Sequence, residues 1–266
     1  MTDSKNNFKK LSIQVSLNGL SFCVLDTISK KIEMVDQVTF KTELTPYLLL
    51  KELKATIEKH NLTGVDFNEV VVLHRNNLFS LVPKALFDPE ELANYLKFNA
   101  KILATDQIVY DQVPNQDIIC VYVPFTNINN YLLNLFGAFE FKHSSLAVIQ
   151  TLLAESKQQK TCYVHVTPKT LEICVIEHKQ LKLYNQFDYL SKEDFLYYIL
   201  FTYEQLGLDT EKVPCHLFGS IDTADENFIL TEKYIKHIYL AEPENTAYEL
   251  DVHQKNAIDL TLLGSI

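Results

Sequence analysis

Arginine is almost absent from this chain, because Arg75 is the only one among 266 residues. Lysine and arginine together number 24 against 34 aspartates and glutamates, so the formal net charge is −10. Nucleic-acid surfaces need clustered basic side chains to displace counterions, and arginine makes most specific contacts to phosphates and bases. The composition therefore argues against a nucleic-acid partner.

Long apolar runs and paired cysteines are also missing. No apolar run approaches the roughly 20 residues of a membrane helix, and the polar first ten residues lack the apolar core of a secretory signal. The five cysteines form no CxxC pair and are odd in number, which argues against a disulfide framework or a zinc site. We expect a cytoplasmic protein, not embedded in a membrane, whose cysteines are buried and reduced.

The familiar catalytic motifs are absent as well. The chain has no P-loop, no glycine-rich dinucleotide fingerprint, no Gly-x-Ser-x-Gly elbow and no His-Glu-x-x-His. No cysteine lies in an electropositive, exposed setting. The sequence therefore assigns no catalytic residue, no metal ligand and no cofactor.

A repeated pattern is the main feature that the chain does contain. The first copy spans 13–25 and is followed by Asp26, and the second spans 164–176 and is followed by Glu177. The offset of 151 residues is the same at both ends of the pattern. Internal repeats indicate architecture, and duplication is the simplest account of two similar halves.

Each half is expected to contain three strands, a helix and a further strand. In the first half the predicted strands are 11–15, 20–25, 32–40 and 70–73, with a helix from Pro46 to just before Gly64. In the second half they are 163–166, 171–177, 181–189 and 213–218, with a helix between Ser191 and Gly207. Thr45 and Ser191 are expected to cap the two helices, and Gly19 to supply a positive φ in its turn.

The middle of the chain follows a different pattern. Its predicted strands are 78–86, 107–113 and 118–123, and its predicted helices are 88–102, 127–136 and 145–155, the last capped by Ser144. The loop 155–161 is the expected boundary between the halves. The predicted domains are a first lobe at 1–155, with an inserted subdomain at about 78–123, and a second lobe at 156–266.

This order of elements resembles the actin-like ATPase superfamily, which includes actin, sugar kinases and Hsp70 chaperones. The middle stretch is similar to the cell-division and pilus-assembly branch, and most of all to type IV pilus assembly ATPases of the M type. It also looks like a bacterial family of unknown function with the same fold. The resemblance implies an α/β fold class: two duplicated RNase H-like (actin-like ATPase) lobes with a small inserted α+β subdomain.

The resemblance also identifies candidate site residues. Active members open each half with an Asp-x-Gly turn, whose glycines let backbone N–H groups approach phosphates. The aspartate positions correspond to Gln14 and His165, and the glycine positions to Ser16 and Thr167. A third loop, which receives adenosine, corresponds to Gly219 and Ser220. Neutral Gln and His side chains cannot replace two carboxylates as ligands of a hard metal, so ATP hydrolysis by the usual route is not expected.

Several interpretations stay open at this point. His165 can be a catalytic base in a cleft that it shares with Gln14, or a hydrogen-bonded structural residue. The chain can be a non-catalytic protein-binding or scaffolding member of the fold, a nucleotide-binding protein with divergent phosphate loops, or an enzyme of another class.

The resemblance further implies a protein or peptide partner. In the pilus-assembly branch the inserted subdomain and cleft recognise a short peptide of a membrane-anchored partner. The apolar side chains Phe79, Leu81 and Val109 are candidates for a partner surface on this subdomain. The alternative is that they form the subdomain's own core.

Overall fold

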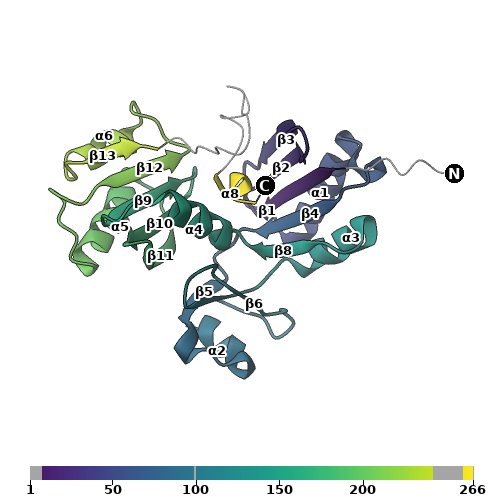
Figure 1. The fold of residues 1–266 in the computed structure, drawn as a ribbon, viewed down its shortest axis with the longest axis horizontal. Coiled ribbons are helices and arrows are strands. Elements are labelled where there is room, and N and C mark those ends of the chain that lie inside the picture. The colour runs from purple at the N-terminus through teal and green to yellow at the C-terminus, as the bar shows by residue number, and fades with distance from the viewer. Residues whose placement is uncertain (1–7, 99, 242–259, 266) are drawn as a thin grey trace. The chain divides into compact units, whose positions relative to one another are not determined.

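The computed structural model describes residues 8–98, 100–241 and 260–265. The chain divides into two compact units, Met1–Val148 with Asn245–Ile266, and Ile149–Glu244. Each unit is built on a five-stranded sheet, and a three-stranded sheet belongs to the inserted subdomain of the first unit (Figure 1).

The first unit's sheet has the strand order β3-β2-β1-β4-β8. Its strands are β1 (Lys9–Ser16), β2 (Gly19–Asp26), β3 (Lys31–Thr39), β4 (Glu69–His74) and β8 (Glu140–His143). Strands β1, β2 and β3 pair antiparallel, whereas β4 runs parallel to both β1 and β8. The residues from Leu11 to Val15 are all buried, as expected for a central strand covered on both faces.

Two helices cover one face of this sheet, α1 (Pro46–Lys59) and α3 (Thr126–Phe136). Thr45 caps α1 as predicted, and its hydroxyl accepts a hydrogen bond from the Leu48 N–H. The helix ends earlier than predicted, because Asn61 adopts a left-handed conformation (φ 52°). A short 3₁₀ turn, Leu62–Gly64, follows it.

The second unit's sheet has the corresponding order β11-β10-β9-β12-β13, with the same pattern of antiparallel and parallel pairs. Its strands are β9 (Thr161–Val166), β10 (Thr170–Glu177), β11 (Gln180–Asp188), β12 (Cys215–Gly219) and β13 (Ile238–Leu240). Both units thus contain the three strands, helix and further strand that the repeat predicts. An origin by duplication stays a prediction.

Helices α5 (Lys192–Gln205) and α6 (Glu226–Glu232) pack on this second sheet. Ser191 and Asp194 form the predicted capping box of α5. Gly207 follows the helix with a φ of 59°, the conformation that favours glycine at a helix end. The helix that both halves were predicted to contain is therefore present in each.

The inserted subdomain contains the sheet β5-β7-β6 and one short helix. Its elements are β5 (Phe79–Pro83), two 3₁₀ turns (Lys84–Leu86 and Pro89–Glu91), α2 (Leu92–Leu96), β6 (Val109–Gln112) and β7 (Ile118–Tyr122). The helix predicted over 88–102 is wrong in length, because only five residues are α-helical. Leu96 is the one buried residue of α2, and it packs in the insert's core with Val82, Ile119 and Val121.

The domain boundaries also differ from the prediction. The division falls after Val148, inside α4 (Ser144–Glu155), because Ala147 packs on Val71 and Leu73 of β4. The C-terminal helix α8 (Leu260–Leu263) contacts β1 and β2 of the first unit, where Leu262 is fully buried. The assignment of α8 to the second lobe was therefore wrong.

The predicted cap at Ser144 is wrong too. Helix α4 begins at Ser144 itself, and the buried Ser144 hydroxyl finds no partner among the described residues.

All five cysteines are free and buried. Burial raises the pKa of the Cys23 and Cys120 thiols to about 12, so these side chains are neutral and unreactive at physiological pH. Within the described ranges, no helix combines the length and apolar composition needed to cross a bilayer.

His74 ends β4 as a fully buried, neutral imidazole. Its Nε2 donates to Asn129 Oδ1 (2.8 Å), and its Nδ1 accepts from the Phe125 N–H (3.1 Å). Burial is the main cause that lowers the pKa of His74 to about 3, and the neighbouring His143 lowers it further. The histidine thereby ties β4 to the start of α3.

This geometry predicts a specific loss of stability in acid. The unfolded chain binds a proton at this histidine below pH 6.5 while the folded chain does not, so the contribution is complete above pH 6.5 and declines as the pH falls. At pH 5 the loss from His74 should be about 2 kcal/mol. Urea unfolding at pH 7 and pH 5 should show a smaller loss in His74→Gln. An equal loss in both proteins would contradict the assignment.

Candidate functional site

The end of β1, next to the β1–β2 turn of the first unit, carries Gln14 and Ser16. Gln14 is buried and lies opposite Ser21 in the strand pair. The Ser16 hydroxyl donates to the Gly19 carbonyl (3.0 Å) and accepts from the Asn18 N–H (3.3 Å). The Ser16 side chain therefore closes the β1–β2 turn.

Gly19 does not have the positive φ that its place in a turn suggested. A Cβ atom at Gly19 would lie 2.6 Å from the Val38 carbonyl oxygen. The reason for glycine here is thus the close approach of β3 to the end of the β1–β2 turn.

The β9–β10 turn of the second unit is closed more completely. The Thr167 N–H donates to the Thr170 carbonyl (3.0 Å), and the Thr170 N–H donates to the Thr167 hydroxyl (3.1 Å). The Tyr189 hydroxyl donates to the Thr167 carbonyl (2.7 Å). Pro168 has no N–H to offer. The N–H groups of Thr167 and Thr170 therefore bind groups of the protein itself.

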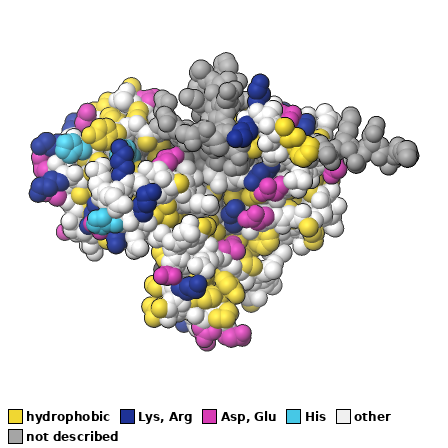
Figure 2. All heavy atoms as spheres, viewed as in Figure 1, with side chains coloured by type: hydrophobic (Ala, Val, Ile, Leu, Met, Phe, Trp, Pro, Cys, Tyr) yellow, Lys and Arg dark blue, Asp and Glu magenta, His cyan; other side chains and the backbone are white. Residues whose placement is uncertain are grey.

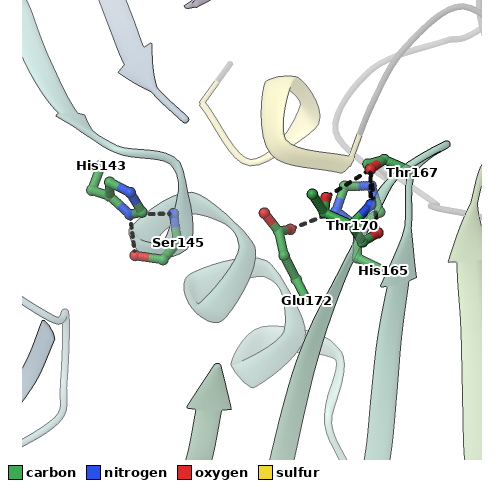
Figure 3. Close-up of polar contacts among 6 residues, drawn as sticks. All are labelled: His143, Ser145, His165, Thr167, Thr170 and Glu172. Atoms are coloured by element: carbon green, nitrogen blue, oxygen red, sulfur yellow. Dashed lines mark hydrogen bonds and ion pairs between the residues drawn. The ribbon is translucent and has the colours of Figure 1, made fainter. Parts of the chain in front are cut away.

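A buried pair lies directly beneath this turn. His165 on β9 and Glu172 on β10 are cross-strand neighbours, each 2% exposed. The His165 Nδ1–H donates to Glu172 Oε2 at 2.7 Å (Figure 3). The His165 ring also stacks on Phe218, with ring centroids 4.9 Å apart and an interplanar angle of 7°. A histidine packed in this way is a structural residue, so the geometry favours that interpretation over a catalytic base.

Gly219 is the last residue of β12, and Ser220 follows it. Both come directly after Phe218, whose ring stacks on His165. Gly219 has a φ of 95°, and a Cβ atom there would lie 2.3 Å from the Val166 carbonyl oxygen and 2.8 Å from the His165 ring. The Ser220 N–H donates to the same Val166 carbonyl (2.8 Å). The retained glycine therefore lets β12 approach β9, whether or not a ligand is bound.

The partner-surface candidates occupy one face of the inserted sheet. Phe79 is only 9% exposed and stacks on the His143 ring at 4.4 Å between centroids, so it cannot supply an open pocket. Leu81 and Val109 are half-buried on the same face. For Phe79 the burial favours the alternative of core packing, while for Leu81 and Val109 the partner surface stays a prediction.

His143 joins this face to the start of α4. Its Nε2 donates to the Asn76 carbonyl (3.1 Å), so its Nδ1 accepts from the Ser145 hydroxyl (2.7 Å) and the Ser145 N–H (3.2 Å) (Figure 3). His143 and Ser145 are both almost fully buried. The histidine thus fixes the insert against the first unit's sheet.

The exposed apolar side chains of the insert lie elsewhere. Leu86 is 72% exposed, Phe98 84% and Leu103 60%. Figure 2 shows hydrophobic side chains gathered on the insert, in the lower part of the view, with acidic side chains at its tip. This surface, rather than Phe79, presents apolar groups to solvent.

A sequence model described as "Protein of unknown function (DUF3822)" matches residues 1–238. The chain belongs to the DUF3822 family. No curated protein matches it.

Solved structures show the fold of this DUF3822 chain. One is a protein of Bacteroides thetaiotaomicron with an actin-like ATPase fold and unknown function, with a TM-score of 0.81, 20% identity, and coverage of 97% of this chain and 99% of that chain. Another is the PilM–PilN type IV pilus biogenesis complex, with a TM-score of 0.61, 12% identity, and coverage of 97% of both chains. A third is the ethanolamine utilization protein EutJ of Carboxydothermus hydrogenoformans, with a TM-score of 0.50, 10% identity, and coverage of 96% and 88%. The predicted actin-like ATPase fold is confirmed.

Two residues of the DUF3822 site were missed from the sequence, Glu172 and Phe218. A hairpin that turns at Pro168 and Lys169 pairs His165 with Glu172, so strand register was the signal that could have found the carboxylate. Phe218 precedes Gly219 and pairs with His165 across β9 and β12. Within the described ranges, no group of three or more His, Cys, Asp or Glu side chains is arranged to hold a metal.

Proposed function

We propose that this DUF3822 protein binds a protein or peptide partner and has lost the hydrolysis of ATP. The closed β9–β10 turn is the observation that carries the proposal. A phosphate-binding turn presents backbone N–H groups to an anion. Here the N–H groups of Thr167 and Thr170 donate within the turn, and Pro168 has none.

The side chains at the two aspartate positions support the same conclusion. Gln14 is neutral and buried, and His165 is hydrogen-bonded to a buried carboxylate. Hard cations such as Mg²⁺ prefer carboxylate and water oxygens. Gly219, which suggested a retained adenosine loop, is accounted for by strand packing. No observation therefore favours the nucleotide-binding alternative.

The exposed surface of the insert supports a binding role. Leu86, Phe98 and Leu103 are large apolar side chains in solvent, and such groups gathered on one surface mark interaction sites. Strand β6 is an edge of the inserted sheet, and an extended peptide can add to such an edge by main-chain hydrogen bonds. The similar PilM structure was solved as a complex with PilN, which fits a partner-binding role for this frame.

The test uses the full chain as immobilised bait in a lysate of cells that express it naturally, followed by affinity measurements with any purified partner. Leu86→Glu with Phe98→Glu should weaken binding at least about tenfold, because an interface depends on a few apolar anchors. Ile28→Glu is the matched control, since Ile28 is 65% exposed on the β2–β3 loop and should change nothing. Leu81→Glu tests the half-buried face. Equal affinity in all variants, or no captured partner, would count against the proposal.

A further inference from the structure

A chain of four aromatic rings runs from the edge of the second unit's core, at Phe187 and Tyr198, to its surface, at Tyr197 and Phe201. Phe187 of β11 stacks on Tyr198 of α5, with centroids 4.6 Å apart and an interplanar angle of 14°. Tyr198 contacts Tyr197 at 5.4 Å, and Tyr197 stacks on Phe201 at 5.7 Å. Tyr197 is 58% exposed and Phe201 40%. We call Tyr197, Tyr198 and Phe201, with Phe187 beside them, the α5 aromatic face.

The fold does not require aromatic residues at these positions, as the first unit shows. Helices α1 and α5 have equivalent caps, Thr45 and Ser191, which are 146 residues apart. At this offset the core residues correspond, because buried Leu49, Leu53 and Ile57 match buried Phe195, Ile199 and Tyr203. The same offset places exposed Lys51 and Ala55 where the second unit has Tyr197 and Phe201. The aromatic rings are therefore specific to α5.

Acidic side chains lie at both ends of this face. Glu193, Tyr197, Phe201 and Glu204 follow one another at helical spacing, so they lie along one side of α5. Both glutamates are exposed, and neither forms an ion pair with another described residue. The two carboxylates are about 16 Å apart along the helix, from the rise of 1.5 Å per residue.

We propose that the α5 aromatic face binds a cationic amphipathic segment of another protein. The aromatic rings supply the apolar contact, since tyrosine and phenylalanine are enriched in interface cores. Glu193 and Glu204 select basic residues that flank the apolar part of the segment. This surface shares no residue with the insert, so the binding proposed above can fail without affecting it.

The negative charge of the protein argues against two other binding partners for this face, a second copy of the chain and an anionic lipid surface. In a two-fold dimer through α5, acidic side chains face one another in either arrangement: antiparallel helices place Glu193 near Glu204 of the copy, and parallel helices place each glutamate near its own copy. Like charges opposed in this way disfavour a second copy of the chain. An anionic lipid surface is disfavoured by the net charge of −10.

The test is fluorescence anisotropy of the full-length protein with a labelled synthetic helix. The peptide presents leucine and phenylalanine on one face, between two lysine pairs eleven residues apart, and a matched peptide carries glutamates in place of the lysines. The lysine peptide should bind and the glutamate peptide should not. Tyr197→Lys with Phe201→Ala, which copies the first unit, should weaken binding at least about tenfold. Glu193→Gln with Glu204→Gln should weaken it and flatten its salt dependence.

The experiment also measures the melting temperature of each variant and, by sedimentation, its oligomeric state. The Tyr197→Lys/Phe201→Ala protein should melt within about 2 °C of the wild type, because both side chains lie outside the core. Lys51→Ala on the equivalent face of α1 is the matched control and should leave the affinity unchanged. The proposal is overturned if the lysine peptide does not bind, or if it binds the variants as well as the wild type. It is also overturned if the wild type is a dimer that these substitutions dissociate.

Discussion

Glu172→Ala is expected to lower the free energy of unfolding by about 1 to 3 kcal/mol, because it removes the acceptor of a buried hydrogen bond. His165 and Glu172 are each 2% exposed and joined at 2.7 Å. Without the carboxylate, the His165 Nδ1–H loses this acceptor in a site that water does not reach. Urea unfolding monitored by circular dichroism measures the loss.

The first unit offers a matched control for this substitution. Ser21 occupies the position equivalent to Glu172 and pairs with Gln14 as Glu172 pairs with His165. Ser21→Ala should cost no more than about 1 kcal/mol. Glu172→Gln keeps the shape of the side chain and should be intermediate. A loss below about 1 kcal/mol for Glu172→Ala would mean that the pair does not stabilise the second unit.

Gly219→Ala is the second substitution with a large expected effect, about 3 kcal/mol or more. The new Cβ would lie 2.3 Å from the Val166 carbonyl oxygen, a backbone atom that cannot move without disturbing the pairing of β12 and β9. The φ of 95° adds backbone strain for any residue with a Cβ atom. Thermal and urea unfolding should both show the loss.

Substitutions at two other glycines separate the steric clash of the new Cβ atom from the strain of a positive φ. Gly207 also has a positive φ (59°), but a Cβ atom there would meet no other atom within 4 Å, so Gly207→Ala should cost only about 1 kcal/mol. Gly64 has neither a positive φ nor a close neighbour, and Gly64→Ala should be neutral or slightly stabilising. Equal effects at Gly219 and Gly207 would remove the steric argument for Gly219.

Local features of this fold could be predicted from the sequence because they depend on neighbouring residues. Thr45 and Ser191 cap their helices as expected, and the strands of both repeats lie close to their predicted limits. The helix predicted over 88–102 has only five α-helical residues, although Leu92, Tyr95, Ala100 and Ile102 pack on the cluster around Leu96, so apolar spacing alone did not define its length. The contact of Leu262 with the first unit joins residues far apart in the chain, which periodicity cannot reveal.

The candidate site, too, could be predicted from the sequence only in part. The resemblance to actin-like ATPases placed Gln14, Ser16, His165 and Thr167 at the positions of the Asp-x-Gly residues, and this assignment stays a prediction. The partner of His165 was not visible, because it is set by strand register across the β9–β10 turn. Glycine is needed equally where a phosphate or another strand approaches the backbone, so the sequence could not show that Val166 of β9 lies close to Gly219. The role of Gly219 in a ligand site stays a prediction.

Magnesium-dependent ATP binding is the measurement that tests the central claim most directly. Isothermal titration of the full-length protein with ATP and Mg²⁺ up to about 1 mM should give no binding heat beyond dilution, because the N–H groups of Thr167 and Thr170 donate within the second turn and Pro168 has none. The same titration with adenosine and without Mg²⁺ is the control for a metal-independent contact at Gly219. A saturable, magnesium-dependent signal for ATP would contradict the account and restore the nucleotide-binding alternative.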